Sequence, residues 1–107
     1  MVRYTTPTLA LYIDCPDIAD AKFYVSIRQK QCEAVLTVDN VTVSTTQTGI
    51  KLDVPLAQLQ TAGFTEGSAE IQVNWIDDVG VRGATAIARI NITDNLLDRV
   101  ISYGGGV

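Results

Sequence analysis

Aspartates and two cysteines are the residues whose chemistry raises the first question in this chain. Three aspartates lie within seven residues around Cys15, and two more are neighbours at the start of a turn sequence: Asp14, Asp17, Asp20, Asp77 and Asp78. Paired carboxylates can hydrolyse glycosides, and clustered carboxylate oxygens can hold Ca²⁺. The spacing of a calcium-binding loop is missing, and Asp is a favoured turn former. We therefore interpret both groups as solvated turn residues.

Other catalytic chemistry finds little support in the sequence. The chain has no histidine, the side chain most often used for proton transfer and for metal binding. A Ser, Thr or Cys nucleophile would need a lysine or carboxylate as its base. The glycine-rich phosphate-binding motifs GxGxxG and GxxxxGK(S/T) are both absent from the sequence. We expect a protein that is not an enzyme and that has no cofactor and no metal.

Charge and hydropathy exclude two classes of partner at this stage. The 107 residues carry a formal charge of -4, and among the basic residues only Arg28 and Lys30 are close in sequence. Nucleic-acid affinity comes mainly from clustered cations, so we expect no nucleic-acid partner. The first apolar run, Leu9 to Ile13, is too short for a signal peptide or a membrane span. We therefore expect no membrane partner, no signal peptide and reduced cysteines.

The stretch from Glu70 to Ile92 predicts two antiparallel strands. Apolar residues alternate with polar ones up to Trp75, and a turn sequence, Asp77 to Gly80, follows. The second strand places small residues on its inward side, namely Ala84, Ala86 and Ala88. Because protein interiors are closely packed, these alanines should face a bulky group. We interpret Trp75 as that group and as a core anchor.

The rest of the chain repeats the alternating pattern. Apolar residues alternate over 9–13, 23–27, 36–38, 41–43 and 50–54, with turn residues between several of these runs. In VPLAQLQTAGF, Pro55 can open a short helix that buries Leu56, Leu59 and Phe64 and ends at a left-handed Gly63. We predict an all-β fold, an immunoglobulin-like antiparallel β-sandwich of about seven strands with one short crossover helix, as a single domain over residues 1–103.

The end of the chain, TDNLLDRVISYGGGV, fits two structures. Residues 94–103 have apolar side chains at helical spacing, and Val100 to Tyr103 could instead form a short strand. The glycine-rich residues 104–107 should form a flexible tail. Apolar side chains that the domain does not cover usually mark a contact surface. Our candidates for partner contact are Leu96, Leu97, Ile101 and Tyr103, together with the outward-facing Ile87.

Four segments carry a family resemblance: TTPTLALYI, GIKLDVPLAQLQTAGF, GSAEIQVNWIDDVGVRGATAIARINI and DNLLDRVI. Together they resemble small bacteriophage and prophage structural proteins of Gram-positive hosts, which are similar to the immunoglobulin-like N-terminal domain of phage baseplate upper proteins. The similarity runs from about Thr5 to Ile101, and Cys15 and Cys32 lie outside its pattern.

The resemblance implies a virion structural protein, such as a head fibre, a head decoration protein, or a baseplate or tail accessory protein. Its partners would be other virion proteins or further copies of itself. It would be made in the bacterial cytoplasm and located in the virion. The family supplies no catalytic residues. The alternative is a small carbohydrate- or peptide-binding β-sandwich module, since the fold class alone does not decide function.

Overall fold

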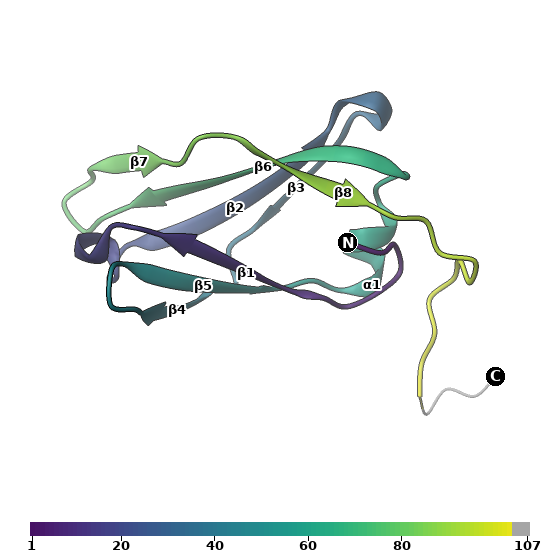
Figure 1. Cartoon of the computed structure of the whole chain (residues 1–107), viewed down its shortest axis with the longest axis horizontal. Helices are drawn as coiled ribbons and strands as arrows, with labels where there is room; N and C mark the ends of the chain where they lie inside the picture. Colours follow the sequence, from purple (N-terminus) through teal and green to yellow (C-terminus); the bar gives the residue numbers. More distant parts are fainter. Residues whose placement is uncertain (104–107) are drawn as a thin grey trace.

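Two antiparallel sheets stack face to face in this protein (Figure 1). The structure is a computed structural model and describes residues 1–103. One sheet has three strands in the order β1 (Thr8–Ile13), β5 (Ile50–Pro55) and β4 (Thr42–Thr45). The other contains β3 (Ala34–Val38), β2 (Lys22–Gln29) and β6 (Gly67–Ile76), and β6 then pairs with both β7 (Arg82–Ala84) and β8 (Ala88–Ile92). The predicted all-β sandwich is confirmed.

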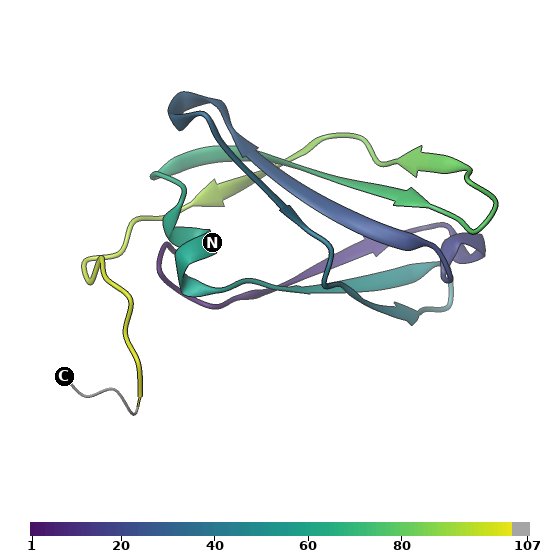
Figure 2. The same ribbon diagram turned by 180° about the vertical axis from the view of Figure 1, so that it is seen from behind.

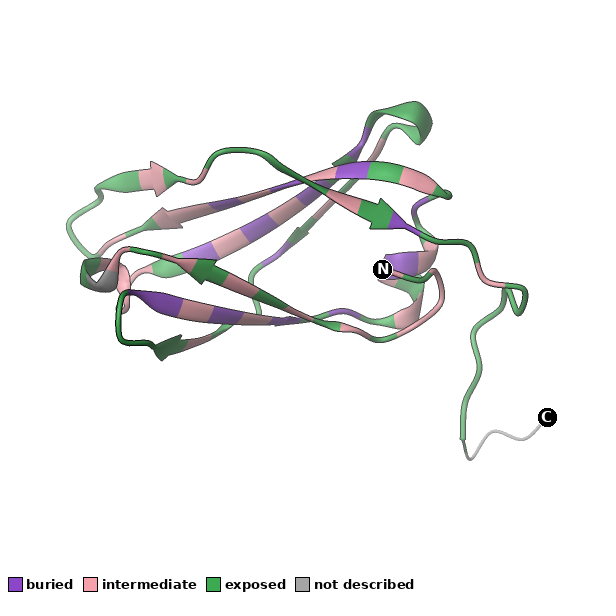
Figure 3. Cartoon of the chain, in the orientation of Figure 1, coloured by how far each residue is buried: buried purple, intermediate pink, exposed green. Residues whose placement is uncertain are grey.

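The core lies between the inward faces of β2, β5 and β6. Buried and less buried residues alternate along these strands, as Figure 3 shows. The side chains on the inward face are almost entirely excluded from water: Phe23, Val25, Ile27, Ile50, Leu52, Val54, Ala69, Ile71 and Val73. Successive strand side chains point to opposite faces, so burying one apolar face leaves the other face to the polar residues.

The chain changes sheets three times through short connections. Residues 14–21 first carry it from β1 to β2. Residues 39–41 carry it from β3 to β4, as seen from behind in Figure 2. Helix α1 (Gln58–Ala62) carries it back from β5 to β6, which confirms the predicted crossover helix. Two single 3₁₀ turns complete the elements, η1 (Pro16–Ile18) before β2 and η2 (Lys30–Cys32) after it.

The details of α1 differ from the prediction. Leu56 and Phe64 are buried as expected, but Leu59 is 72 % exposed. The backbone of Leu56 donates a hydrogen bond to the carbonyl of Pro7, so the chain stays extended past Pro55 and the helix begins later. This delay rotates Leu59 outward. Gly63 has φ -68°, in the right-handed region, so the predicted left-handed ending was wrong.

The predicted second strand of the hairpin is interrupted. Ala84 pairs with Asn74 whereas Ala88 pairs with Ile71, so the later chain carries one extra residue. At this bulge the backbone N–H of Val73 donates to the Thr85 hydroxyl at 3.1 Å. One extra residue reverses which side chains face inward. Ala84 therefore faces outward, and Ala86 lies in the irregular connection between β7 and β8. Ala84, Ala86 and Ala88 are all exposed, so the prediction that these alanines pack inward was wrong.

Gly83, and not an alanine, lies against Trp75. The two residues are paired across β6 and β7, and a Cβ atom built on Gly83 would lie 2.5 Å from the indole ring. On its other side the indole lies near Phe23, with ring centroids 6.4 Å apart. Trp75 is half-buried and packs against the core cluster. The absence of a side chain at Gly83 thus gives the indole its place.

We expect Gly83→Ala to destabilise the fold by about 1–3 kcal/mol, because the added methyl group overlaps the indole. Urea unfolding measures this change. Gly63→Ala is the matched control, since its new Cβ meets only ordinary contacts and its φ is negative. Equal stability of the two variants would contradict the packing of Trp75 on Gly83.

A buried amide joins the end of β2 to the segment before β6. The Gln29 side chain is fully buried; its Nε2 donates to the carbonyl of Thr65 at 2.8 Å and its Oε1 accepts from the Thr65 N–H at 2.7 Å. The Cys32 thiol also donates to this Oε1 at 3.0 Å. Both Cys15 and Cys32 are free thiols. Buried polar groups are stable only when paired, so Gln29 holds these two segments in register.

Replacing Gln29 by alanine should cost about 1–3 kcal/mol of unfolding free energy, because the Thr65 N–H and C=O lose their buried partners. Gln31→Ala provides the control. Gln31 also donates to a backbone carbonyl, that of Ser68 at 3.0 Å, but it is exposed. Thermal and urea unfolding of both variants would show the difference, and a cost for Gln31→Ala as large as that for Gln29→Ala would refute it.

The first residues lie alongside the end of β8. Val2 forms a parallel bridge with Thr93, and the Met1 amino group donates to the carbonyl of Asn91 at 2.7 Å. Beyond this bridge residues 94–103 form neither a helix nor a strand, so neither of the two structures expected for this segment is observed. The predicted glycine-rich tail, residues 104–107, lies outside the described residues.

Candidate interaction surfaces

The segment of residues 94–103 exposes a row of apolar side chains. It leaves the sandwich beside α1 and runs away from the body of the molecule (Figure 1). Leu96 and Tyr103 are fully exposed, and Leu97 and Ile101 are about half exposed. These are four of the five residues predicted to contact a partner. The structure brings them together on one extended segment that the sandwich does not cover.

Polar contacts hold this segment to the sandwich. Arg3 forms an ion pair with Asp94 at 2.9 Å and donates to the carbonyl of Ala62, the last residue of α1, at 3.0 Å. The hydrogen bond from Arg3 is the main cause that lowers the pKa of Asp94. Farther along, the side-chain amide of Gln58 pairs with both backbone groups of Ile101, at 2.7 and 2.9 Å. Polar contacts near both ends of the segment therefore attach it to the sandwich, while its apolar side chains remain exposed.

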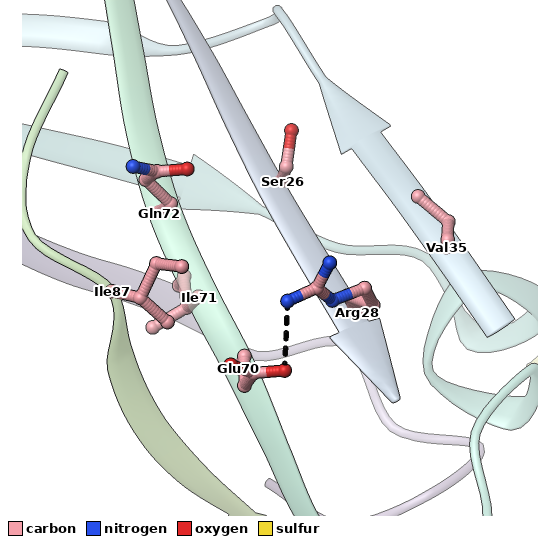
Figure 4. Close-up of a pocket in the computed structure, with 7 residues that line it drawn as sticks. All are labelled: Ser26, Arg28, Val35, Glu70, Ile71, Gln72 and Ile87. Atoms are coloured by element: carbon pink, nitrogen blue, oxygen red, sulfur yellow. Dashed lines mark hydrogen bonds and ion pairs between the residues drawn. The ribbon is translucent and has the colours of Figure 1, made fainter. Parts of the chain in front are cut away.

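Ile87, the fifth predicted contact residue, lies on a different surface. It lines a hollow of about 210 Å³ on the outer face of the five-stranded sheet, opposite Val35 (Figure 4). Both side chains are more than half exposed. An adjoining hollow of about 350 Å³ shares Ser26 with the first and is lined by Tyr24, Thr37, Asn74 and Arg82 among others. The lining of both hollows is mostly apolar in area, although several polar side chains border them.

Five of the eight basic side chains lie on this outer face, although only Arg28 and Lys30 are close in sequence. They form two groups: Lys22 and Arg82 flank Ile76 at one end of β6, and Arg28, Lys30 and Arg89 surround Glu70 at the other end. Outward positions on paired strands lie about 5 Å from one another. Sequence spacing alone could not reveal these groups, because they depend on which strands pair and in what register.

One carboxylate lies among these cations. Glu70 forms ion pairs with Arg28 at 3.0 Å and with Lys30 at 3.7 Å, and Arg89 is its cross-strand neighbour. The hydrogen bond from Arg28 is the main cause that lowers the pKa of Glu70, and the nearby charges of Arg28, Lys30 and Arg89 act in the same direction. A single carboxylate cannot balance all of these cations.

The five aspartates lie in connections between strands, three of them between β1 and β2 and two between β6 and β7: Asp14, Asp17, Asp20, Asp77 and Asp78. Asp77 accepts backbone hydrogen bonds from Val79 at 3.1 Å and Val81 at 2.8 Å, so its carboxylate shapes the β6–β7 turn. Within residues 1–103 no three His, Cys, Asp or Glu side chains converge as a metal ion would require. Nor does any helix in that range have the length and apolar character needed to cross a membrane.

Comparison with protein-family models, with curated protein sequences and with solved structures found no match.

The Arg28–Glu70 ion pair predicts how the stability of the fold depends on acidic pH. Because the folded state lowers the pKa of Glu70 from its ordinary value of 4.5, its stabilising contribution is present above that pH. The contribution is lost as the pH falls through the lowered value. We expect the stability difference between the wild type and Glu70→Gln to shrink as the pH falls below 4.5.

Denaturant unfolding at a series of acidic pH values would follow this change. Arg28→Gln serves as the control, because without its main partner Glu70 should show a weaker pH dependence. An unchanged difference between the wild type and Glu70→Gln over the whole series would contradict the ion pair.

Proposed function

We propose that this chain is a non-enzymatic structural protein of a phage virion, acting through protein–protein contacts. The observation that carries the proposal is the exposed apolar segment of residues 94–103, which the Arg3–Asp94 ion pair and the Gln58–Ile101 hydrogen bonds attach to the sandwich. Exposed apolar groups of this extent usually mark a contact surface. Because these contacts already order the segment, less of its conformational entropy would be lost when a partner binds.

The strand arrangement supports the resemblance to phage structural proteins. We infer an immunoglobulin-like sandwich that lacks its first strand from the sheet orders β1-β5-β4 and β3-β2-β6-β7, with β8 also paired to β6. We infer a head fibre, a head decoration protein, or a baseplate or tail accessory protein. Its partners are other virion proteins or further copies of the chain. It is made in the bacterial cytoplasm and then becomes part of the virion.

A second candidate function is a small carbohydrate- or peptide-binding module. The two adjoining hollows on the outer sheet face favour it, since Tyr24 lies there with the amide side chains of Gln72 and Asn74. Aromatic rings and amides are common in such sites. A specific glycan-array signal that is lost in Tyr24→Ala would favour this module over the structural protein.

The structural role is tested on particles purified from the phage or prophage that encodes the chain. We expect mass spectrometry to find the chain in these particles. A variant with Leu96→Ser, Leu97→Ser and Ile101→Ser should be incorporated at least about tenfold less, because it removes apolar area that a partner would cover. The free energy of unfolding of this variant should differ from that of the wild type by less than about 0.5 kcal/mol, since these side chains are exposed.

The matched control changes an apolar side chain that is similarly exposed but lies on α1, Leu59→Ser. Its incorporation should equal that of the wild type. Particles that assemble without the chain, or that take up both variants alike, would contradict the proposed role of this segment.

A further inference from the structure

The outer face of the five-stranded sheet and the rest of the chain carry opposite charges. Of the eight basic residues, five lie on this face, and only one of the twelve acidic residues, Glu70, lies among them. The face therefore has a formal charge of +4. With a total of -4, the remainder of the molecule has a formal charge of -8. Such a separation creates a strong field across a small protein.

Most of the positive charge on the face is not neutralised by ion pairs. Glu70 pairs with Arg28 and Lys30, but over residues 1–103 no carboxylate lies within ion-pair distance of Lys22, Arg82 or Arg89. Arg82 donates to the Asn74 side chain at 3.1 Å, and the Lys22 ammonium lies 5.3 Å from the centre of the Tyr24 ring. These contacts orient the cations and leave their charge in place.

The opposite charge is concentrated at one end of the sandwich. Lys22 and Ile76 are paired neighbours, so the loop before β2 and the turn after β6 lie side by side there. Figures 1 and 2 both show these connections at the end away from α1. Lys22 and Arg82 of the outer face lie beside these connections. The connections contain five aspartates: Asp14, Asp17, Asp20, Asp77 and Asp78. We call this group the acidic end.

Shape and composition also suit a protein partner on the outer face. Val35 and Ile87 are exposed between the charged groups, as in interfaces that place apolar side chains inside a polar rim. The strand β2 spans eight residues, about 26 Å. The molecule measures 48 × 33 × 24 Å, so the end of one copy is similar in size to the face of another.

We propose that the outer face of the five-stranded sheet docks the acidic end of a second copy of this chain. The contact joins two different surfaces, so repeating it generates an open row or a closed ring. This proposal deepens and rests on the proposed structural role, and it names one partner. Nucleic acid is the competing anionic partner, and the DNA-binding test below distinguishes the two.

Sedimentation velocity of the purified full chain over a range of concentrations tests the contact. At about 50 mM NaCl we expect concentration-dependent association, and at about 500 mM the association constant should fall at least tenfold because salt screens exposed charges. Association that does not respond to salt would overturn the proposal.

Charge reversal tests both surfaces. Arg82→Glu with Arg89→Glu alters the face, and Asp17→Lys with Asp78→Lys alters the acidic end; all four side chains are exposed. Each variant alone should lose at least about tenfold in association constant. An equimolar mixture of the two variants should regain association. The negative face of one variant then meets the positive end of the other, and the two unchanged surfaces also have opposite charge.

The control variant, Asp39→Lys with Glu66→Lys, makes the same change in net charge at exposed positions outside the acidic end. It should associate like the wild type, and circular dichroism and thermal melts should show that every variant folds. If the control fails as badly as the acidic-end variant, general charge and not docking explains the result, and the proposal is overturned.

Two further outcomes separate this proposal from others. Binding of a 30-base-pair DNA duplex that is lost in the Arg82→Glu, Arg89→Glu variant would assign the face to nucleic acid and overturn the proposal. A wild-type chain that stays monomeric at low salt, yet is found in purified particles, would also overturn it while the structural role stands. A chain that forms salt-sensitive rows but is absent from particles would support docking and contradict the structural role.

Discussion

The burial of the inward faces of β2, β5 and β6 is the constraint on which the other features of the molecule depend. Val25, Ile50, Leu52 and Val54 are completely shielded from water, and Ile27 nearly so. The pairing of β2 with β6 extends over seven residue pairs and fixes the register between them. Since side chains alternate along a strand, the burial of one set decides which residues share the opposite face. The basic surface is therefore a direct consequence of how the core is packed.

The sequence was sufficient for the fold class and insufficient for the details that depend on one residue. Alternation predicted the strands because it reflects burial of one face, which is a local property of the chain. The bulge at Thr85 has no such signature, because a single hydroxyl and one extra residue produce it. Leu59 was misplaced for a related reason, since the bond between Leu56 and Pro7 joins residues far apart in sequence.

The candidate surfaces were predictable to different degrees. The apolar residues of the segment 94–103 could be named from their types alone, because nothing in the sequence offered them a place in the core. The basic face could not be seen in the same way. Lys22 and Arg89 come to lie on the same sheet face only because their strands pair with β6, and strand pairing is a tertiary property. Gln29 was missed because a polar residue at the end of an apolar strand normally faces water.

The parallel bridge between Val2 and Thr93 brings both ends of the described chain to the same side of the sandwich, beside α1. A polypeptide fused to either end would therefore emerge from that side. The five aspartates at the far end would remain unobstructed, about the length of the molecule away. Attachment of the chain at these ends would therefore leave the opposite end of the sandwich facing the solvent.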